Sequence, residues 1–206
     1  MKVKINRQSS KRIDFTFEPN IGDAIPPMSS VFLTGHNLHR LRDGMLSLLC
    51  FLMARDLISD SLILEGAEVP AYQAAIFQNH FGSLPFMCHP ISHVDRAILP
   101  SMSPRTQQIT EIADTDCRAD IAVSDTNLGF EIKFCEGEER ERISFISSIP
   151  LFCSMASREP RIVLHAIKTI IAFELVGATT LLDPDGYLNS SPIRQIIVDS
   201  GIAVAR

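Results

Sequence analysis

Hydrophobic residues recur at steps of three and four along residues 38–58, and this spacing predicts the first helix of the chain. Leucines and methionines occupy much of the circumference of that helix, so we expect it to be buried. Residues 1–30 alternate weakly between apolar and polar positions, as in Ile13, Phe15 and Phe17. This alternation predicts an edge strand or a hairpin before the proline-bearing loop at residues 19–27.

The same patterns predict most of the remaining elements. Proline suits the first turn of a helix and Gly suits the position after its end, so Pro70 and Gly82 bracket one helix, and Pro192 and Gly201 bracket another. Ser191 is the expected N-cap of the second. Residues 161–176 are long and apolar, and periodicity does not decide between a buried strand and a buried helix there. Strands are expected at residues 62–64, 84–88, 108–113, 178–182 and 202–205.

The clearest short-range signal is a hairpin. Two apolar, partly β-branched segments, residues 117–123 and 128–134, flank the turn-forming residues 124–127, and Gly129 follows. The charged segment EGEERER, at residues 136–142, has charges at helical spacing, and we expect it to begin an exposed helix over residues 138–148 that Pro150 stops.

Strands and helices that alternate along the chain indicate an α/β fold with a central mixed sheet flanked by helices. A chain of 206 residues has enough apolar side chains for one ordinary core. We expect residues 61–206 to form the main α/β core and residues 1–60 to form an N-terminal elaboration within the same compact domain.

Composition limits the classes of function. The net charge is −5, which excludes a basic protein that coats nucleic acid through bulk electrostatics. The five cysteines form no C-x-x-C pair and most lie beside apolar residues, so we expect buried, reduced thiols and a cytoplasmic location. The N-terminus carries no apolar stretch typical of a secretory signal. The longest apolar segment, residues 45–54, is too short to cross a bilayer, so no membrane association is expected.

Three charged residues of the predicted hairpin are expected to converge on one face. Side chains alternate across a strand, so Asp120 on the first strand and Glu131 and Lys133 on the second point away from the apolar side. A carboxylate on each strand suits a hard divalent cation. Lys133 is the only lysine between residues 12 and 167, and a lysine at this position would orient a water or steady a developing phosphate charge.

This pattern of Asp120, an intervening turn and Glu131-Ile132-Lys133 resembles the signature of the PD-(D/E)xK phosphodiesterase superfamily, over residues 65–172. Ala119 stands where the motif has proline. The resemblance implies a restriction-endonuclease-like core in the order helix, three strands, helix and strand. It further implies that Asp120, Glu131 and the backbone carbonyl of Ile132 bind Mg²⁺ or Mn²⁺ and that Lys133 assists the attacking water.

Members of this superfamily also take a metal ligand from the first core helix. Glu68 is the candidate here, Glu65 is the reserve, and His80 is a third possibility because some members place a histidine there. Arg118 and Arg140 lie near the predicted site in the sequence, so they are candidates for substrate phosphate contacts.

The expected function is therefore that of a Mg²⁺- or Mn²⁺-dependent nuclease, such as an endonuclease, acting on DNA in preference to RNA. The alternative is a catalytically inactive module of the same fold that binds protein or nucleic acid. The acidic chain predicts a homodimer or a partner protein that strengthens the grip on nucleic acid. A zinc site at Cys88, His89 and His93 with Cys117 is a weaker alternative, because zinc ligands usually show tighter paired spacings.

Overall fold

The structure is a computed structural model that describes residues 1–81, 85–93, 108–111, 121–126, 128–136, 139–176, 180–182 and 191–205. Within these ranges, eleven strands form one mixed sheet in the order β13-β12-β8-β9-β10-β11-β3-β2-β1-β4-β6. Its strands are β1 (Lys2–Ser9), β2 (Arg12–Glu18), β3 (Ser30–Thr34), β4 (Ser61–Glu65), β6 (Met87–His89), β8 (Gln108–Glu111), β9 (Ile121–Thr126), β10 (Gly129–Glu136), β11 (Glu139–Ser147), β12 (Thr180–Leu182) and β13 (Ala203–Ala205). Two short strands, β5 (Val69–Pro70) and β7 (Ile91–Ser92), pair separately.

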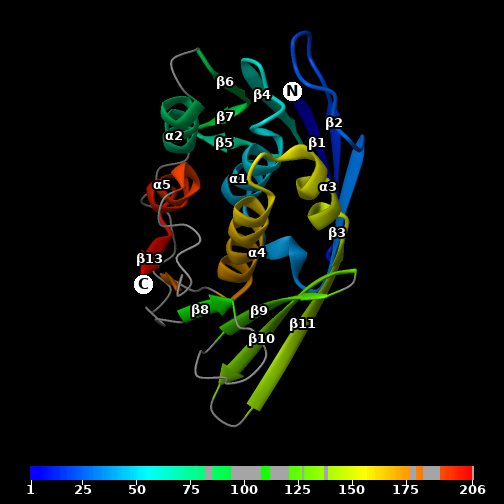
Figure 1. Ribbon diagram of the computed structural model, residues 1–206, viewed down its shortest axis with the longest axis vertical. Helices are drawn as coiled ribbons and strands as arrows, with labels where there is room; N and C mark the ends of the chain where they lie inside the picture. Colours follow the sequence, from blue (N-terminus) through cyan, green and yellow to red (C-terminus); the bar gives the residue numbers. More distant parts are fainter. Residues whose placement is uncertain are drawn as a thin grey trace.

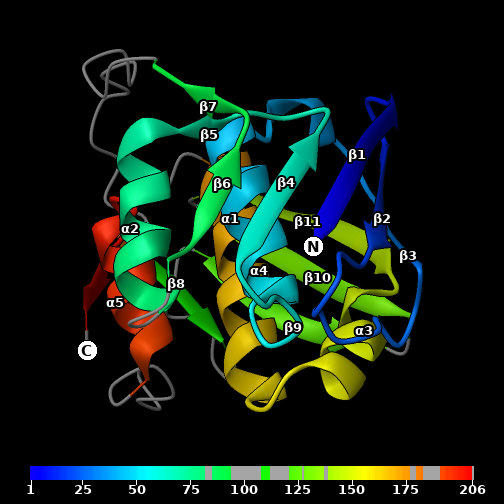
Figure 2. The same ribbon diagram turned by 90° about the horizontal axis from the view of Figure 1, so that it is seen from above.

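Helices flank this sheet, which confirms the predicted α/β class and its central mixed sheet. They are α1 (Asp43–Ala54), α2 (Ala71–Phe81), α3 (Ile149–Ala156), α4 (Pro160–Val176) and α5 (Pro192–Asp199), with a 3-10 turn η1 (Leu38–Arg40) before α1. In Figure 1, β1, β2 and β3 stand on one side of α1 and α4, and β8 to β11 lie beneath them, so the sheet wraps around the two helices. Helices α2 and α5 lie side by side on the other flank (Figure 2).

The N-terminal strands lie inside the sheet. β1 and β2 form the expected hairpin, β2 pairs with β3, and β3 also pairs with β11. Apolar residues such as Ile5, Phe15 and Leu33 alternate toward the helices and are buried. Residues 1–60 therefore supply three neighbouring strands between β11 and β4, together with the central helix α1.

The helix predicted over residues 38–58 is shorter than expected and is interrupted near its start. Leu41 and Arg42 have extended backbones, so η1 ends there and α1 begins at Asp43. Every residue from Met45 to Ala54 is buried, which confirms the prediction of a buried helix. No described helix is long and apolar enough to cross a membrane.

The helix predicted over residues 138–148 is wrong, because these residues form strand β11, which pairs antiparallel with β10 from Gly129↔Ile146 to Glu136↔Glu139. Exposure alternates along its second half: Arg142, Ser144 and Ile146 are exposed, whereas Phe145 and Ser147 are buried. This period of two belongs to a strand. The charges of EGEERER also fit helical spacing. In the structure Phe145 is buried opposite Phe130 in the ladder between β10 and β11.

Pro150 does not stop a helix; it lies in the first turn of α3. Proline is favoured there because its missing N–H needs no partner in a first turn. Residues 161–176, left undecided between strand and helix, lie in α4, where Val163, Ala166, Ile167 and Ile170 are buried at steps of three and four. Helix α4 packs against α1, α3, β8 and β9, and these contacts explain its apolar character.

The other predicted elements agree closely with the structure. The expected strands at residues 62–64, 108–113, 178–182 and 202–205 correspond to β4, β8, β12 and β13, and the strand at residues 84–88 corresponds to β6, with residues 82–84 outside the described ranges. The predicted helices correspond to α2 and α5. The Ser191 hydroxyl accepts a hydrogen bond from the Ile193 N–H at 3.2 Å, which confirms the predicted N-cap of α5.

Candidate functional site

The predicted hairpin is present as β9 and β10. Their register pairs Thr126 with Gly129 and Ile121 with Phe134, so the strands run further than expected and the turn is shorter. Phe130 and Ile132 are fully buried, whereas Glu131 between them is half-buried on the opposite face. This alternation places Glu131 on the side of the sheet away from α1 and α4, as the sequence predicts.

The neighbours of Glu131 across the sheet are small and polar. Ser124 of β9 and Ser144 of β11 are its register partners. Two residues further along β10, Lys133 is opposite Ala122 on one side and Arg142 on the other. Arg142 and Ser144 are exposed, so this face of β11 meets solvent. A carboxylate can bind a metal cation, and an exposed guanidinium can bind a phosphate oxygen, so the two groups together suit contact with a phosphate group.

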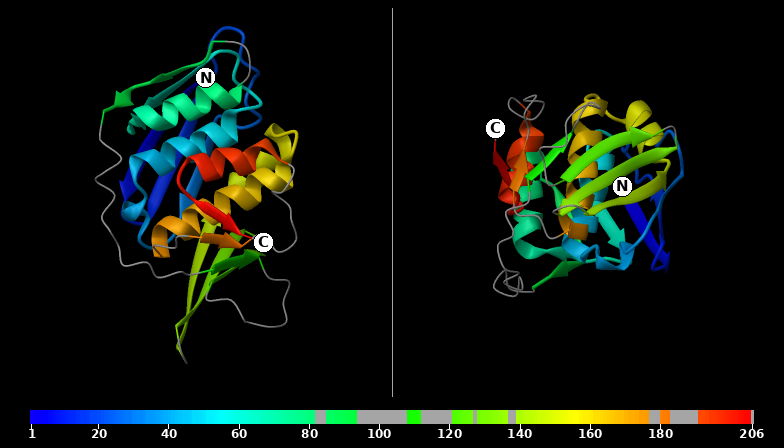
Figure 3. Two further views of the ribbon diagram at one scale, coloured as in Figure 1. Left: turned by 90° about the vertical axis from the view of Figure 1, so that its left-hand side faces the viewer. Right: turned by 90° about the horizontal axis from the view of Figure 1, so that it is seen from below.

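The structure describes Lys133 and Arg140 by their backbone positions only, and two further candidates lie outside it altogether. Asp120 and Arg118 lie outside the described residues. Arg140 is in β11, opposite Cys135, which places it beyond Lys133 toward the far end of the hairpin. β10 and β11 reach beyond the helices at that end (Figure 3).

The structure does not bring the helix-side candidates to Glu131. Glu68 lies between β4 and β5, and β4 is five strand positions from β10 in the sheet. The carboxylate of Glu65 pairs with the Lys2 ammonium at 2.6 Å. His80 donates from Nε2 to Oδ2 of Asp199 in α5 at 2.9 Å. Each of these residues is thus positioned by contacts in another part of the molecule.

Among the described residues, Glu131 supplies one hard oxygen donor of the kind that Mg²⁺ and Mn²⁺ prefer. Ile132 is buried, and its backbone lies within the ladders to Val123 and Ile143. Over the described ranges, no three His, Cys, Asp or Glu side chains come close enough to hold a metal ion. A metal at this hairpin therefore needs Asp120 as its second carboxylate.

The weaker zinc alternative falls partly outside the described residues, because Cys117 is not described. Cys88 is buried in β6, and burial raises the pKa of its thiol to about 12. Zinc binding requires a thiolate, which such burial disfavours. Cys50 and Cys153 are also buried free cysteines, in agreement with the expectation of buried, reduced thiols.

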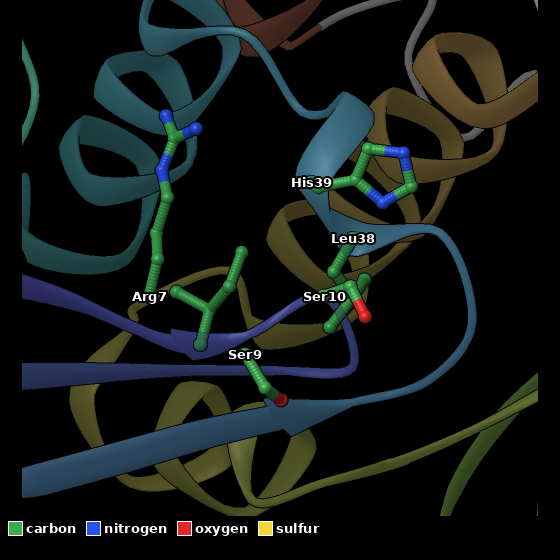
Figure 4. Close-up of a pocket in the computed structure, with 6 residues that line it drawn as sticks. Arg7, Ser9, Ser10, Leu38 and His39 are labelled. Carbon is green, nitrogen blue, oxygen red and sulfur yellow. The ribbon is translucent and has the colours of Figure 1, made fainter.

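Sequence reasoning missed a small cavity beside the tip of the β1–β2 hairpin. Its volume is about 180 Å³, and its lining comes from the β1–β2 hairpin and from η1 (Figure 4). Arg7 and His39 lie on opposite sides of it, and Ser9 and Ser10 lie between them. These segments are about thirty residues apart in the chain. The signal that could have identified them in the sequence is that both are rich in basic residues and contain no carboxylate.

No family model, no curated protein and no solved structure matches this chain. Function is therefore inferred from the residues and from their arrangement.

Proposed function

We propose that this protein is a metal-dependent nuclease of the PD-(D/E)xK type, with a restriction-endonuclease-like core, that hydrolyses phosphodiester bonds in DNA. One observation supports the proposal above the others. Phe130 and Ile132 are fully buried while Glu131 lies on the opposite face of β10 beside Ser144, so a carboxylate lies on the solvent side of a strand whose other face is buried and apolar.

In this proposal Asp120 and Glu131 bind Mg²⁺ or Mn²⁺, with the Ile132 carbonyl as a further donor. A divalent cation at such a site lowers the pKa of water and offsets phosphate charge. Lys133 positions the attacking water, and Arg142, its neighbour in register on β11, holds a phosphate oxygen of the substrate. Arg118 and Arg140 remain candidates for further phosphate contacts.

A cleavage assay tests the proposal. The protein is incubated with supercoiled plasmid, single-stranded DNA and RNA in Mn²⁺, in Mg²⁺ or in EDTA. We expect metal-dependent cleavage that falls by at least about 100-fold in Asp120→Ala, Glu131→Gln and Lys133→Ala, since each removes a charge from the reacting centre.

Glu18→Gln and Lys4→Ala are matched controls. They make the same changes of charge on β2 and β1 of the same sheet, where the two residues pair with each other. We expect cleavage within about twofold of wild type in both, because surface ion pairs contribute little to stability. Metal-dependent cleavage that survives the three hairpin substitutions would contradict the site assignment.

The second candidate is a module of the same fold class that binds nucleic acid or protein without hydrolysis. It is favoured by β11, because the resemblance implies a helix directly after the E-x-K strand and residues 139–147 are extended instead. Absence of cleavage, together with no Mn²⁺ binding in isothermal titration calorimetry, would support this candidate over the nuclease.

A further inference from the structure

Two short basic segments lie against each other at the tip of the β1–β2 hairpin. Residues 7–12 and 36–42 contain five of the 19 lysine and arginine residues of the chain and two of its six histidines, but no carboxylate. The basic residues are Arg7, Lys11, Arg12, His36, His39, Arg40 and Arg42. In a protein of net charge −5, such a concentration marks a local surface of opposite sign.

Backbone hydrogen bonds hold the two segments together. The N–H of Gly35 donates to the carbonyl of Lys11 at 2.9 Å, and the N–H of Leu38 donates to the carbonyl of Ser10 at 3.0 Å. Asn37, with φ of 60°, turns the chain from β3 into η1 at this point. The basic side chains of both segments are exposed to solvent.

Three of the five lysine and arginine side chains are already neutralised. Arg7 pairs with Asp43, Arg12 pairs with Asp14, and Arg42 pairs with Glu174. Lys11 and Arg40 form no ion pair with any carboxylate in the described part of the chain. Two positive charges are therefore left without an acidic partner among the residues that the structure describes.

The cavity described above opens within this surface. Its polar lining is formed by Arg7, Ser9, Ser10 and His39, and its apolar lining is formed by Ile13 and Leu38 (Figure 4). Hydroxyl and cationic groups suit phosphate oxygens.

The tip of the β1–β2 hairpin lies three strands away from the Gly129 end of β10. Gly129, Ile146, Thr34 and Arg12 are register partners across β10, β11, β3 and β2. Three strand spacings make roughly 14 Å, which is close to the length of about four nucleotides at the helical rise of DNA. A segment of about four nucleotides therefore spans the spacing between Gly129 and Arg12 along this register.

We propose that this surface, centred on Lys11 and Arg40, binds the phosphate backbone of the nucleic acid on which the hairpin acts. The inference rests on the proposed function, because it extends the substrate track of the same site into the N-terminal strands, which the resemblance does not cover.

Binding without cleavage tests the proposal. Fluorescence anisotropy of labelled single-stranded and duplex DNA is measured in EDTA over a range of salt concentrations. We expect Lys11→Gln/Arg40→Gln to bind at least about tenfold more weakly than wild type at low salt. The slope of log K against log salt should fall by about 1.4 to 1.8, because each lost phosphate contact removes about 0.7 to 0.9.

Arg158→Gln/Arg161→Gln is the matched control, since it removes two exposed cations, one just before α4 and one in its first turn. We expect it to bind within about twofold of wild type. Equal weakening in both double variants, or no binding by wild type, would overturn the proposal.

Cleavage in Mn²⁺ separates the two proposals. Weaker DNA binding by Lys11→Gln/Arg40→Gln with no cleavage by wild type would remove the nuclease function and keep the binding surface. Cleavage by wild type with unchanged binding in Lys11→Gln/Arg40→Gln would keep the function and remove the surface.

Discussion

Gly35 lies so close to the ring of Phe145 that a Cβ atom on residue 35 would come within 2.3 Å of Cδ1 of that ring. Phe145 cannot easily move aside, because it stacks on Phe130 with ring centroids 4.8 Å apart and an interplanar angle of 16°. Both rings are buried. The contact joins the end of β3 to the β10–β11 hairpin that carries Glu131, so the absence of a side chain at Gly35 helps to seat that hairpin against the core.

We expect Gly35→Ala to lower the free energy of unfolding by about 1–3 kcal/mol, because overpacking forces ring or backbone displacement. Urea denaturation followed by circular dichroism measures the change. Phe145→Leu tests whether the ring causes this loss, since the smaller side chain leaves room for the new methyl group. If Gly35→Ala costs as much in the Phe145→Leu background as in wild type, the ring is not the reason.

The hydrogen bond between His80 and Asp199 predicts a pH-dependent contribution to stability. The hydrogen bond from His80 lowers the pKa of Asp199, and Gln195 adds a second hydrogen bond at 2.6 Å. A carboxyl whose folded pKa is depressed stabilises the protein above its unfolded pKa of about 3.9 and loses this contribution as pH falls through the folded value.

Asp199→Asn should therefore lower the free energy of unfolding by about 0.2–1 kcal/mol near neutral pH, the usual size for a partly exposed pair. The difference from wild type should persist down to about pH 5 and shrink only as the pH falls through about 3.9 and below in urea titrations. Glu68→Gln removes a carboxylate that has no described side-chain partner, and we expect no measurable change from it. A difference between wild type and Asp199→Asn that persists undiminished in acid would contradict the assignment.

The N-cap of α5 predicts a loss of stability in Ser191→Ala. The Ser191 hydroxyl accepts the Ile193 N–H, and without it this buried donor loses its partner. We expect the free energy of unfolding to fall by about 1 kcal/mol in thermal or urea denaturation. Ser154→Ala, at an exposed position of α3, is the control and should change it far less. Equal losses in the two variants would show that capping does not account for the effect.

Burial of three thiols predicts protection from alkylation. Burial raises the pKa of both Cys88 and Cys153 to about 12 and raises that of Cys50 as well. The thiolate is the reactive form, so iodoacetamide at mildly alkaline pH should leave these three residues unmodified in the folded protein. Peptide mass mapping before and after urea treatment measures this. If any of the three reacts in the folded protein as fast as free cysteine does in solution, its burial is contradicted.

Local alternation and helical spacing predicted several parts of this structure correctly. Phe130 and Ile132 on one side of β10 and Glu131 on the other follow from a period of two, which a strand imposes wherever it lies. The burial of α1 follows in the same way from its apolar circumference.

The errors arose where one local pattern fits two structures. EGEERER has charges at helical spacing, but pairing with the whole length of β10 selects the strand. Pro150 suits both the end of one helix and the first turn of the next, and the position of α3 decides between them.

The sequence by itself determined the α/β class, the hairpin and the solvent side of Glu131, because these depend on periodicity within one segment. Only the tertiary structure decided which distant segments meet. It separates Glu68 and Glu65 from the hairpin, directs His80 to Asp199, and brings Lys11 close to the segment that carries Arg40. The physical reason is that strand order and helix packing depend on how all the apolar faces are buried together, and no single segment carries that information.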